Sequence, residues 1–356
     1  MPLLPLYNSF VMATPEILLS SQRMEFPIFA TDVERLNFCP LCAGNLRNIS
    51  SVLIRGDIIF FSTSMCERCC HICRETRPTK QWFSEAFQRR ERFQQGAGIS
   101  AINPEIEADR YQRYSQVGSA LNLPIGTTLL DIGCGPGTGL KALMNLGYKV
   151  LGVEEDATRA DHGINLGYPI AKSQWEQFEP QQRFNVITCL HSLEHFHEPE
   201  QLLRKLVDWL DPAGKIVVEV PNFCHFVQDW TDSLYLAHMA NYTPMTLSRL
   251  GENVGLRVIA RLHHYDSVAR NDENLCLVFE RGRDSLPQNE VSTWDEAVSK
   301  YAHGLETAAS PPYTFEVPAI NDISLCYKNS SRISSALREN LHMRTVRRQN
   351  ERFVVS

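Results

Sequence analysis

The residues best suited to chemistry lie in a glycine-rich stretch near the middle of the chain. An apolar run over 128–132 contains Asp131 and leads into four glycines at alternate positions, the first three being Gly133, Gly135 and Gly137. A helix-like run follows, so the order predicts a buried strand, a tight turn and a helix N-terminus. Glycine lets a ligand approach the main chain, and a helix N-terminus offers free N–H groups. The stretch therefore predicts a cofactor-binding loop.

Two classes of cofactor compete for this loop. The dinucleotide fingerprint G-x-G-x-x-G needs its third glycine where this chain has Thr138 or Leu140. Asp131 instead stands two residues before the first glycine, where a carboxylate would face a cationic group of the ligand. S-adenosylmethionine carries two such groups, an ammonium and a sulfonium. We therefore expect this molecule as the cofactor.

Residues 111–281 resemble the class I S-adenosylmethionine-dependent methyltransferases, whose first motif has the same acidic-x-Gly-x-Gly-x-Gly form. Glu154 ends the next apolar run, 149–154, and lies 23 residues after Asp131. In this fold an acid at that place accepts hydrogen bonds from both ribose hydroxyls. The resemblance implies an α/β fold with a seven-stranded Rossmann-like methyltransferase sheet.

The remaining cofactor contacts are expected where the later strands end, because ligands of open α/β sheets bind beyond the carboxyl ends of the strands. Further strands are predicted at 169–173, 184–190, 214–222, 256–260 and 275–280, with a packing helix over 200–210. The third and fourth strands deliver Gln174 and Trp175 to the adenine and His191 to the cofactor. A helix over 108–121 carries Tyr111 and Tyr114. In this family the corresponding helix covers the cofactor, so both tyrosines are expected near it.

Acceptor chemistry is expected from two histidine-containing segments. After the fourth strand, His191-Ser-Leu-Glu-His195 resembles the family's own sequence at this place; an inverted zinc-peptidase motif also fits, but it would have to lie within a long helix. A ring-rich insertion follows the fifth strand, and related sugar C-methyltransferases have Tyr-x-Glu-His there. This chain has Tyr235-Leu-Ala-His238, without the glutamate, which favours O- over C-methylation. The predicted catalytic residues are His238, His195 and Tyr235, and the predicted substrate contacts are Tyr242, Trp230 and His225.

A cysteine-rich segment precedes this core. Six of the eleven cysteines fall between positions 39 and 73. Two C-x-x-C knuckles separated by 23 residues predict a tetrahedral, structural zinc site with the ligands Cys39, Cys42, Cys66 and Cys69. Cys70 and Cys73 supply a second possible knuckle, so the choice of four remains open. A similar knuckle followed by an Arg-Pro element and an aromatic helix precedes the core in many bacterial sugar and natural-product methyltransferases, and the counterparts here are Arg77-Pro78 and residues 82–93.

Composition narrows the class of protein. The chain has 356 residues, 43% of them hydrophobic, and a formal net charge of −6, which argues against a dedicated nucleic-acid binder. We expect no membrane span. The clustering of the cysteines as metal ligands indicates a reducing compartment, so a cytoplasmic location is expected. The expected acceptor is a small molecule. Four parts are predicted: an irregular arm at 1–37, a zinc-binding β module at 38–100, the methyltransferase domain at 101–283, and a C-terminal extension at 284–356 ending in a basic, helix-like stretch.

Two alternatives remain open. One is an RNA methyltransferase that uses the zinc module to hold nucleic acid, since some ribosomal RNA guanine methyltransferases begin with a Cys-Pro-Leu-Cys knuckle, as at 39–42 here. The other is a catalytically inactive methyltransferase fold that serves as a binding subunit. The sequence leaves the oligomeric state undetermined.

Overall fold

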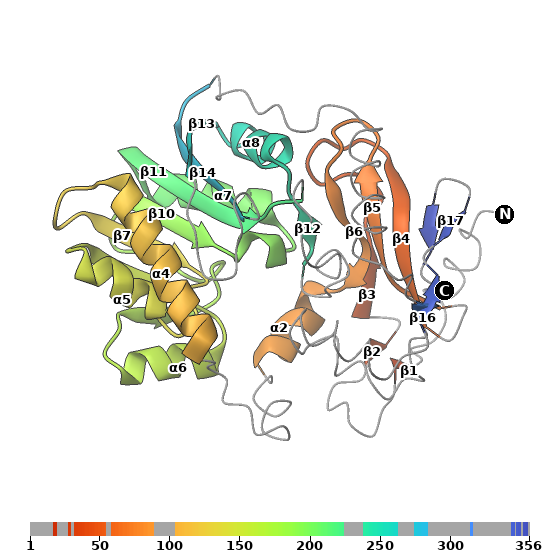
Figure 1. Cartoon of the computed structure of the whole chain (residues 1–356), viewed down its shortest axis with the longest axis horizontal. Helices are drawn as coiled ribbons and strands as arrows, with labels where there is room; N and C mark the ends of the chain where they lie inside the picture. Colours follow the sequence, from red (N-terminus) through yellow and green to blue (C-terminus); the bar gives the residue numbers. More distant parts are fainter. Residues whose placement is uncertain are drawn as a thin grey trace. The chain divides into compact units, whose positions relative to one another are not determined.

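The computed structural model describes residues 32–54, 58–88, 104–223, 238–262 and 274–283, with short strands at 17–19, 28–29, 314–315, 343–345, 347–349 and 352–354. The chain divides into two compact units (Figure 1). Unit 1 comprises 1–87, 226–241 and 291–356, and unit 2 comprises 88–225 and 242–290. None of the helices in the described residues is long and apolar enough to cross a membrane.

Unit 2 is built on a seven-stranded sheet with the order β13-β14-β11-β10-β7-β8-β9. In chain order the strands are β7 (Thr128–Ile132), β8 (Lys149–Glu154), β9 (Ile170–Lys172), β10 (Phe184–Leu190), β11 (Leu210–Pro221), β13 (Leu256–Leu262) and β14 (Asn274–Arg281). β9, β8, β7, β10 and β11 run parallel, whereas β14 is antiparallel to both β11 and β13. This confirms the predicted seven-stranded Rossmann-like methyltransferase sheet.

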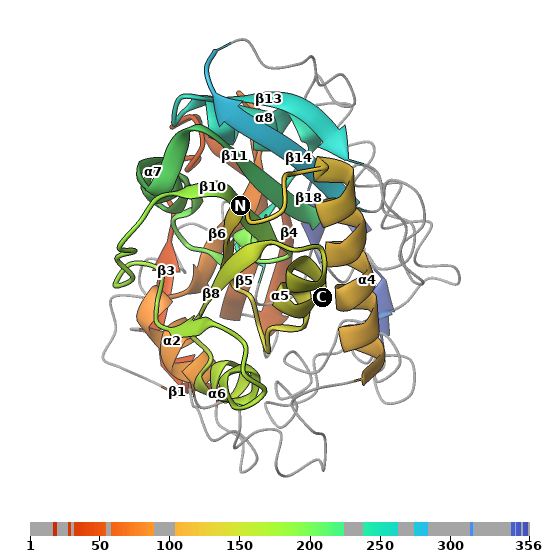
Figure 2. The ribbon, with the colours of Figure 1, turned by 90° about the vertical axis from the view of Figure 1, so that its left-hand side faces the viewer.

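Among the described residues of unit 2, five helices accompany this sheet. They are α4 (Pro104–Leu121), α5 (Thr138–Asn145), α6 (Ala157–Asn165), α7 (Pro199–Trp209) and α8 (Pro244–Glu252). Figure 2 shows α4 and α5 together on one face and α7 and α8 on the other. β10 is buried at every residue but Asn185, and β11 is buried over 216–220, as expected for strands covered on both faces. The segment with the peptidase-like spacing forms only a short 3₁₀ turn, η2 (Leu193–His195), so it does not meet the helical requirement of a zinc peptidase.

Unit 1 contains a five-stranded antiparallel sheet. Its strands are β3 (Val33–Arg35), β4 (Leu46–Ile54), β5 (Ile58–Cys66), β6 (Ile72–Pro78) and β12 (Ala240–Asn241). The order is β12-β6-β5-β4, and β3 also pairs with β6. The helix α2 (Lys80–Gln88) follows β6, at the place where an aromatic helix was predicted.

Two parts of unit 1 differ from the sequence predictions. The arm at 1–37 was predicted to be irregular, but its β3 pairs with β6, and β1 (Ile17–Leu19) pairs with β2 (Ile28–Phe29). The basic C-terminal stretch was predicted to be helix-like, but it contains β16 (Met343–Thr345), paired with β15 (Thr314–Phe315), and the hairpin of β17 (Arg347–Gln349) and β18 (Arg352–Val354). The helix prediction for the C-terminal stretch was therefore wrong, because pairing with other strands decides its structure and the local charge pattern does not.

The division between the units also departs from the predicted domain limits. Residues 226–241 were included in the methyltransferase domain, yet they cluster with unit 1. The physical reason is visible at β12, which pairs antiparallel with β6, with Ala240 opposite Cys73 and Asn241 opposite Ile72. The chain therefore passes from unit 2 into unit 1 within the insertion after β11 and returns to unit 2 at residue 242.

Candidate cofactor and metal sites

The glycine-rich loop connects β7 to α5 as the sequence predicts. Gly133, Gly135 and Gly137 have φ angles of 73°, 58° and 81°, in the left-handed region that favours glycine. Gly137 is the N-cap of α5, so the loop ends at a helix N-terminus. Gly139 has another role, because a Cβ built there would lie 2.7 Å from the Tyr114 ring. It is a packing glycine between α4 and α5.

Asp131 is fully buried at the end of β7. Its Oδ2 accepts a hydrogen bond from the Tyr114 hydroxyl at 2.9 Å, and its Oδ1 accepts one from the Thr188 hydroxyl of β10 at 2.6 Å. Burial raises the pKa of Asp131 to about 7, although these two donors and the nearby Arg110 cation oppose the shift. The ionisation of a carboxylate in this position depends strongly on any cation close to it.

Glu154 stands at the end of β8, beside the glycine loop. Its Oε2 accepts a hydrogen bond from Gly135 N at 2.8 Å, and its Oε1 accepts one from Asp156 N at 2.9 Å. A carboxylate offers about four acceptor positions, so two backbone bonds leave room for a ligand diol. The hydrogen bond from Gly135 N therefore orients the Glu154 side chain beside the predicted cofactor-binding loop.

Arg110 is a charged residue at this loop that sequence reasoning missed. Its guanidinium lies over Gly135, because a Cβ built on that glycine would be 3.4 Å from Nη1, and Glu107 pairs with the same nitrogen. Arg110 and Tyr114 are four residues apart on α4, which places them on one face. That spacing is the sequence signal by which Arg110 could have been found.

The ends of β9 and its neighbour β8 carry Gln174 and Glu155. Burial, followed by the charge of Glu154, raises the pKa of Glu155 to about 7, while a hydrogen bond with Gln174 opposes the rise. Trp175 is only 8% exposed and packs edge-on against Phe196, with the ring centroids 6.2 Å apart. Little of its ring surface is left for an adenine, so this geometry favours a packing role for Trp175.

His191 follows β10 and is surrounded by charged side chains. Its Nε2 lies 3.0 Å from Glu219 Oε1, and Arg113 Nε lies 3.2 Å from the same oxygen. Glu194 Oε1 is 3.8 Å from His191 Nδ1 and 3.9 Å from His195 Nε2. Glu219 and Arg113 were not predicted as site residues, because Glu219 lies inside an apolar strand and Arg113 on a mostly polar helix.

Tyr111 is not brought to the glycine loop. Its hydroxyl accepts a hydrogen bond from the amide of Asn145, the last residue of α5, whereas the loop adjoins the first turn of that helix. The two ends of α5 are about 10 Å apart at 1.5 Å per residue. The structure therefore supports Tyr114, but not Tyr111, at this end of the sheet.

The predicted acceptor residues are only partly described. Tyr235, Trp230 and His225 lie outside the described residues. Tyr242 is 1% exposed, and its carbonyl accepts a hydrogen bond from Phe223 N, so it closes the base of the insertion. Their roles remain predictions.

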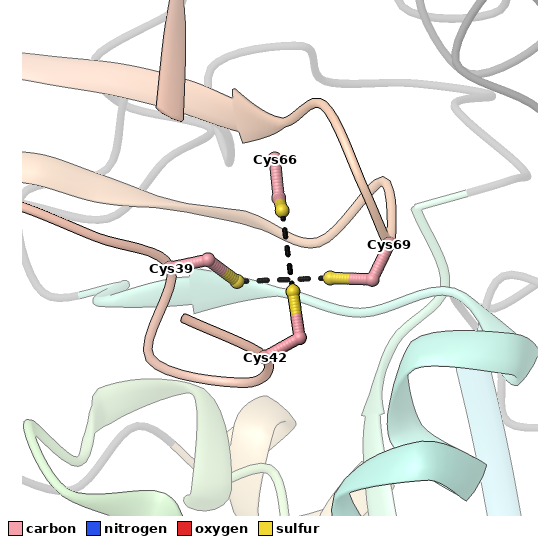
Figure 3. A group of neighbouring side chains, drawn as sticks. All are labelled: Cys39, Cys42, Cys66 and Cys69. Atoms are coloured by element: carbon pink, nitrogen blue, oxygen red, sulfur yellow. Dashed lines mark hydrogen bonds between the residues drawn. The ribbon is translucent and has the colours of Figure 1, made fainter. Parts of the chain in front are cut away.

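The four predicted zinc ligands come together in unit 1. The thiols of Cys39, Cys42, Cys66 and Cys69 point toward one another (Figure 3), and all their sulfurs lie within 4.8 Å. Cys39 and Cys69 are 3.6 Å apart at sulfur, and Cys42 and Cys66 are 3.4 Å apart. A tetrahedral zinc with Zn–S bonds of about 2.3 Å needs sulfurs about 3.8 Å apart. The cluster fits such an ion closely.

The two knuckles are equivalent in their backbone hydrogen bonds. Leu41 N donates to Cys39 Sγ and Arg68 N donates to Cys66 Sγ, both at 3.4 Å. Burial raises the pKa of Cys66 to about 11, so a dication would be needed to hold its thiolate at neutral pH. A Cβ on Gly44 would come within 2.9 Å of Cys66 Sγ, so this glycine leaves the space that the sulfurs occupy.

The fold and the loop together define a class. A seven-stranded sheet in this order, with an acidic residue in β7 and a glycine loop directly after that strand, is a Rossmann-like methyltransferase domain. Residues 103–261 match the family described as Methyltransferase domain. The predicted methyltransferase class is thereby confirmed.

Curated relatives match part of the same region. A ubiquinone biosynthesis O-methyltransferase of Aeromonas salmonicida is 24% identical over 152 residues, which is 37% of this chain and 64% of that protein. The corresponding protein of Caulobacter vibrioides is 30% identical over 125 residues, 33% of this chain and 50% of the relative. The chain thus spans 64% and 50% of the length of these two relatives.

Solved structures with a related fold include a magnesium protoporphyrin IX methyltransferase of Synechocystis with bound SAM. It is 14% identical, with a TM-score of 0.42, and covers 57% of this chain and 97% of its own. The CcbJ methyltransferase of Streptomyces caelestis is 16% identical, with a TM-score of 0.42, and covers 56% of this chain and 98% of its own.

Proposed function

We propose that the protein is an S-adenosylmethionine-dependent methyltransferase that acts on an oxygen of a small-molecule acceptor. The observation that carries the proposal is the pairing of two carboxylates, Asp131 and Glu154, around one glycine loop at neighbouring strand ends. The predicted dinucleotide alternative would need a third glycine where Thr138 or Leu140 stands.

The residues present fit the chemistry of this cofactor. Glu154 would accept hydrogen bonds from the ribose hydroxyls, Asp131 would face the ammonium, and Arg110 would pair with the carboxylate of the methionine part. Gln174 and His191 follow β9 and β10, so they are further candidates for contact with the cofactor at the carboxyl ends of these strands. When bound, the cofactor supplies the methyl group, so the protein must align the acceptor and remove its proton.

Proton removal is assigned to a histidine, because imidazole accepts a proton near neutral pH. His238 is the first choice, with His195 second and Tyr235 as a further candidate. Alanine replaces the glutamate of the Tyr-x-Glu-His element at position 237, and the matching relatives are named O-methyltransferases. Both observations favour a hydroxyl over a carbon as the acceptor atom.

The cysteine cluster is proposed to bind one structural zinc ion. Four thiolates would fill a tetrahedral coordination sphere and leave no open position for a substrate or water. Cys39, Cys42, Cys66 and Cys69 are the ligands, because their sulfurs form the described cluster. The cluster supports this choice over one that includes Cys70 or Cys73.

The first test is isothermal titration of the full chain with S-adenosylmethionine and, separately, with NAD. We expect binding of S-adenosylmethionine alone and a loss of about tenfold or more in affinity in Glu154→Gln, because a hydrogen bond to a charged group contributes about 1.5–3 kcal/mol. Conversion of the cofactor to its demethylated product is then followed with phenolic compounds, nucleotide sugars and RNA as acceptors. Binding of NAD, or of neither ligand, would overturn the proposed function; turnover with RNA alone would favour the nucleic-acid alternative.

A further inference from the structure

Arg74 is a fully buried arginine in the middle of β6. Its Nη1 donates a hydrogen bond to Thr63 Oγ1 of β5 at 2.5 Å, and its Nε donates one to the carbonyl of His238 at 3.1 Å. The sequence analysis assigned Arg74 no role. His238, in contrast, is the predicted base and lies 164 residues further along the chain.

The backbone of the same residue extends this contact. Arg74 N donates to the carbonyl of Met239 at 2.9 Å, and the following residues Ala240 and Asn241 form β12 opposite Cys73 and Ile72. Residues 238–241, here termed the β12 segment, therefore lie along one edge of β6. Arg74 is the residue of β6 that binds this segment with both its main chain and its side chain.

Burying a guanidinium costs free energy of desolvation unless its N–H groups donate hydrogen bonds. The partners of Arg74 therefore indicate which part of the fold it stabilises. Neighbouring charges on β6 bind elsewhere: Glu75 pairs with Arg35 and accepts from Ser64, and Arg77 pairs with Glu34. Arg74 instead joins β6 to the β12 segment through the hydrogen bond from its Nε to the His238 carbonyl. Its planar fork holds Thr63 and a main-chain carbonyl in two fixed directions, which a flexible ammonium does not.

We propose that Arg74 is a positioning residue that fixes the β12 segment and, through the carbonyl of His238, the location of the His238 imidazole. The part that concerns catalysis rests on the proposed function, in which His238 is the base. The part that concerns geometry does not depend on it. Because the bond goes to the main chain, Arg74 acts on this segment whatever side chain stands at position 238.

The test uses the full chain and needs no acceptor. Hydrogen exchange, read by mass spectrometry, measures the protection of residues 238–243, and the rate of carbethoxylation by diethyl pyrocarbonate measures access to the imidazole of His238, which is 6% exposed. The variants are Arg74→Met, Arg74→Lys and the matched control Arg35→Met, which removes an arginine of β3 that pairs with Glu75.

In Arg74→Met we expect exchange of the β12 segment and modification of His238 to become at least about tenfold faster, with the amides of β7 and β8 unchanged. Arg74→Lys should recover part of this protection, and Arg35→Met should leave both rates within about twofold. Thr63→Val keeps the arginine but removes one of its partners, so it provides a milder variant if Arg74→Met does not fold, and a severalfold increase is expected there.

Unchanged rates in Arg74→Met, or an equal increase in Arg35→Met, would overturn the proposal. Titration of Arg74→Met with S-adenosylmethionine separates the two proposals, since the affinity should equal that of the wild type. If the wild type itself fails to bind the cofactor, the proposed function fails, while the exchange and modification results for Arg74 keep their meaning. With an acceptor in hand, the variant should lose turnover at an unchanged KM for the cofactor.

Discussion

Acidification is expected to weaken the binding of S-adenosylmethionine because Asp131 takes up a proton. The raised pKa of about 7 means that the carboxyl is about nine-tenths ionised at a pH of about 8 and about one-tenth ionised at a pH of about 6. Only the ionised form attracts a cationic ligand. If binding keeps Asp131 ionised, the apparent dissociation constant rises about tenfold between these two pH values.

Calorimetry can follow this effect in two independent ways. The affinity is measured across the pH range, and near a pH of about 7 the binding heat is compared in buffers that differ in ionisation enthalpy. Release of about half a proton is expected on binding at that pH, because about half of the Asp131 carboxyls are then protonated in the free protein. The Asp131→Asn variant, titrated with the same ligand, shows what the ionisation of the ligand itself contributes.

Two further variants sharpen the assignment to Asp131. Thr188→Val removes a hydrogen bond to the ionised carboxylate, so the midpoint of the pH dependence should move upward by roughly one pH unit. Glu155 also has a pKa of about 7, but Glu155→Gln should preserve the dependence. The reasoning is refuted if Asp131→Asn keeps the wild-type pH profile, or if Glu155→Gln abolishes it.

Three other predictions concern packing and metal binding. Gly139→Ala should lower the free energy of unfolding by about 1–3 kcal/mol in denaturant titrations, because its Cβ would meet the Tyr114 ring at 2.7 Å; no change would mean that the ring moves freely. Elemental analysis should find about one zinc per chain in the wild type and in Cys73→Ser but a deficit in Cys42→Ser, and equal zinc contents in the two variants would contradict the chosen ligand set. Gly44→Val should also lower the zinc content, since its side chain would intrude on the sulfur cluster; full retention of zinc would refute this.

The strands of unit 2 were predictable from local pattern alone. The apolar runs at 128–132, 149–154 and 184–190 coincide with β7, β8 and β10, because each run is bounded by glycine or polar residues and is long enough for a strand but not for a helix. The cysteine ligands were predictable for a similar reason, since two C-x-x-C knuckles carry their own turn geometry. In both cases the decisive information lies within a few consecutive residues.

The contacts that orient the candidate site were not predictable in this way. Thr188 binds Asp131 because β10 and β7 are neighbours in register, and the 57 residues between them give no local sign of that pairing. Arg110 belongs to a polar helix face that reads as solvated. The Thr188 contact can be recognised only when the strand order is known, whereas the spacing of Arg110 from Tyr114 is a signal within the sequence itself.

β6 shows the same limit in unit 1. Its sequence, Ile-Cys-Arg-Glu-Thr-Arg-Pro over 72–78, contains three charges and reads as a strand open to solvent, yet every residue in it is buried. One edge of β6 pairs with β5, and the other is covered by β12 over its first half and by β3 over its second. Both covering strands come from segments far away in the sequence, one of them predicted to be irregular.

This arrangement bears on how the cysteine module should be regarded. The chain leaves the methyltransferase sheet after β11. A hydrogen bond from Phe223 N to the Tyr242 carbonyl joins the two ends of the insertion that follows. The β12 segment, just before Tyr242, pairs with β6 and completes the sheet of unit 1. Removing the module would leave the backbone groups of β12 without their partners, and buried groups of that kind are costly. A chain truncated before residue 104 should therefore keep its seven strands but lose hydrogen-exchange protection over 238–243. Full protection of that segment in the truncated chain would show instead that the module is an independent attachment.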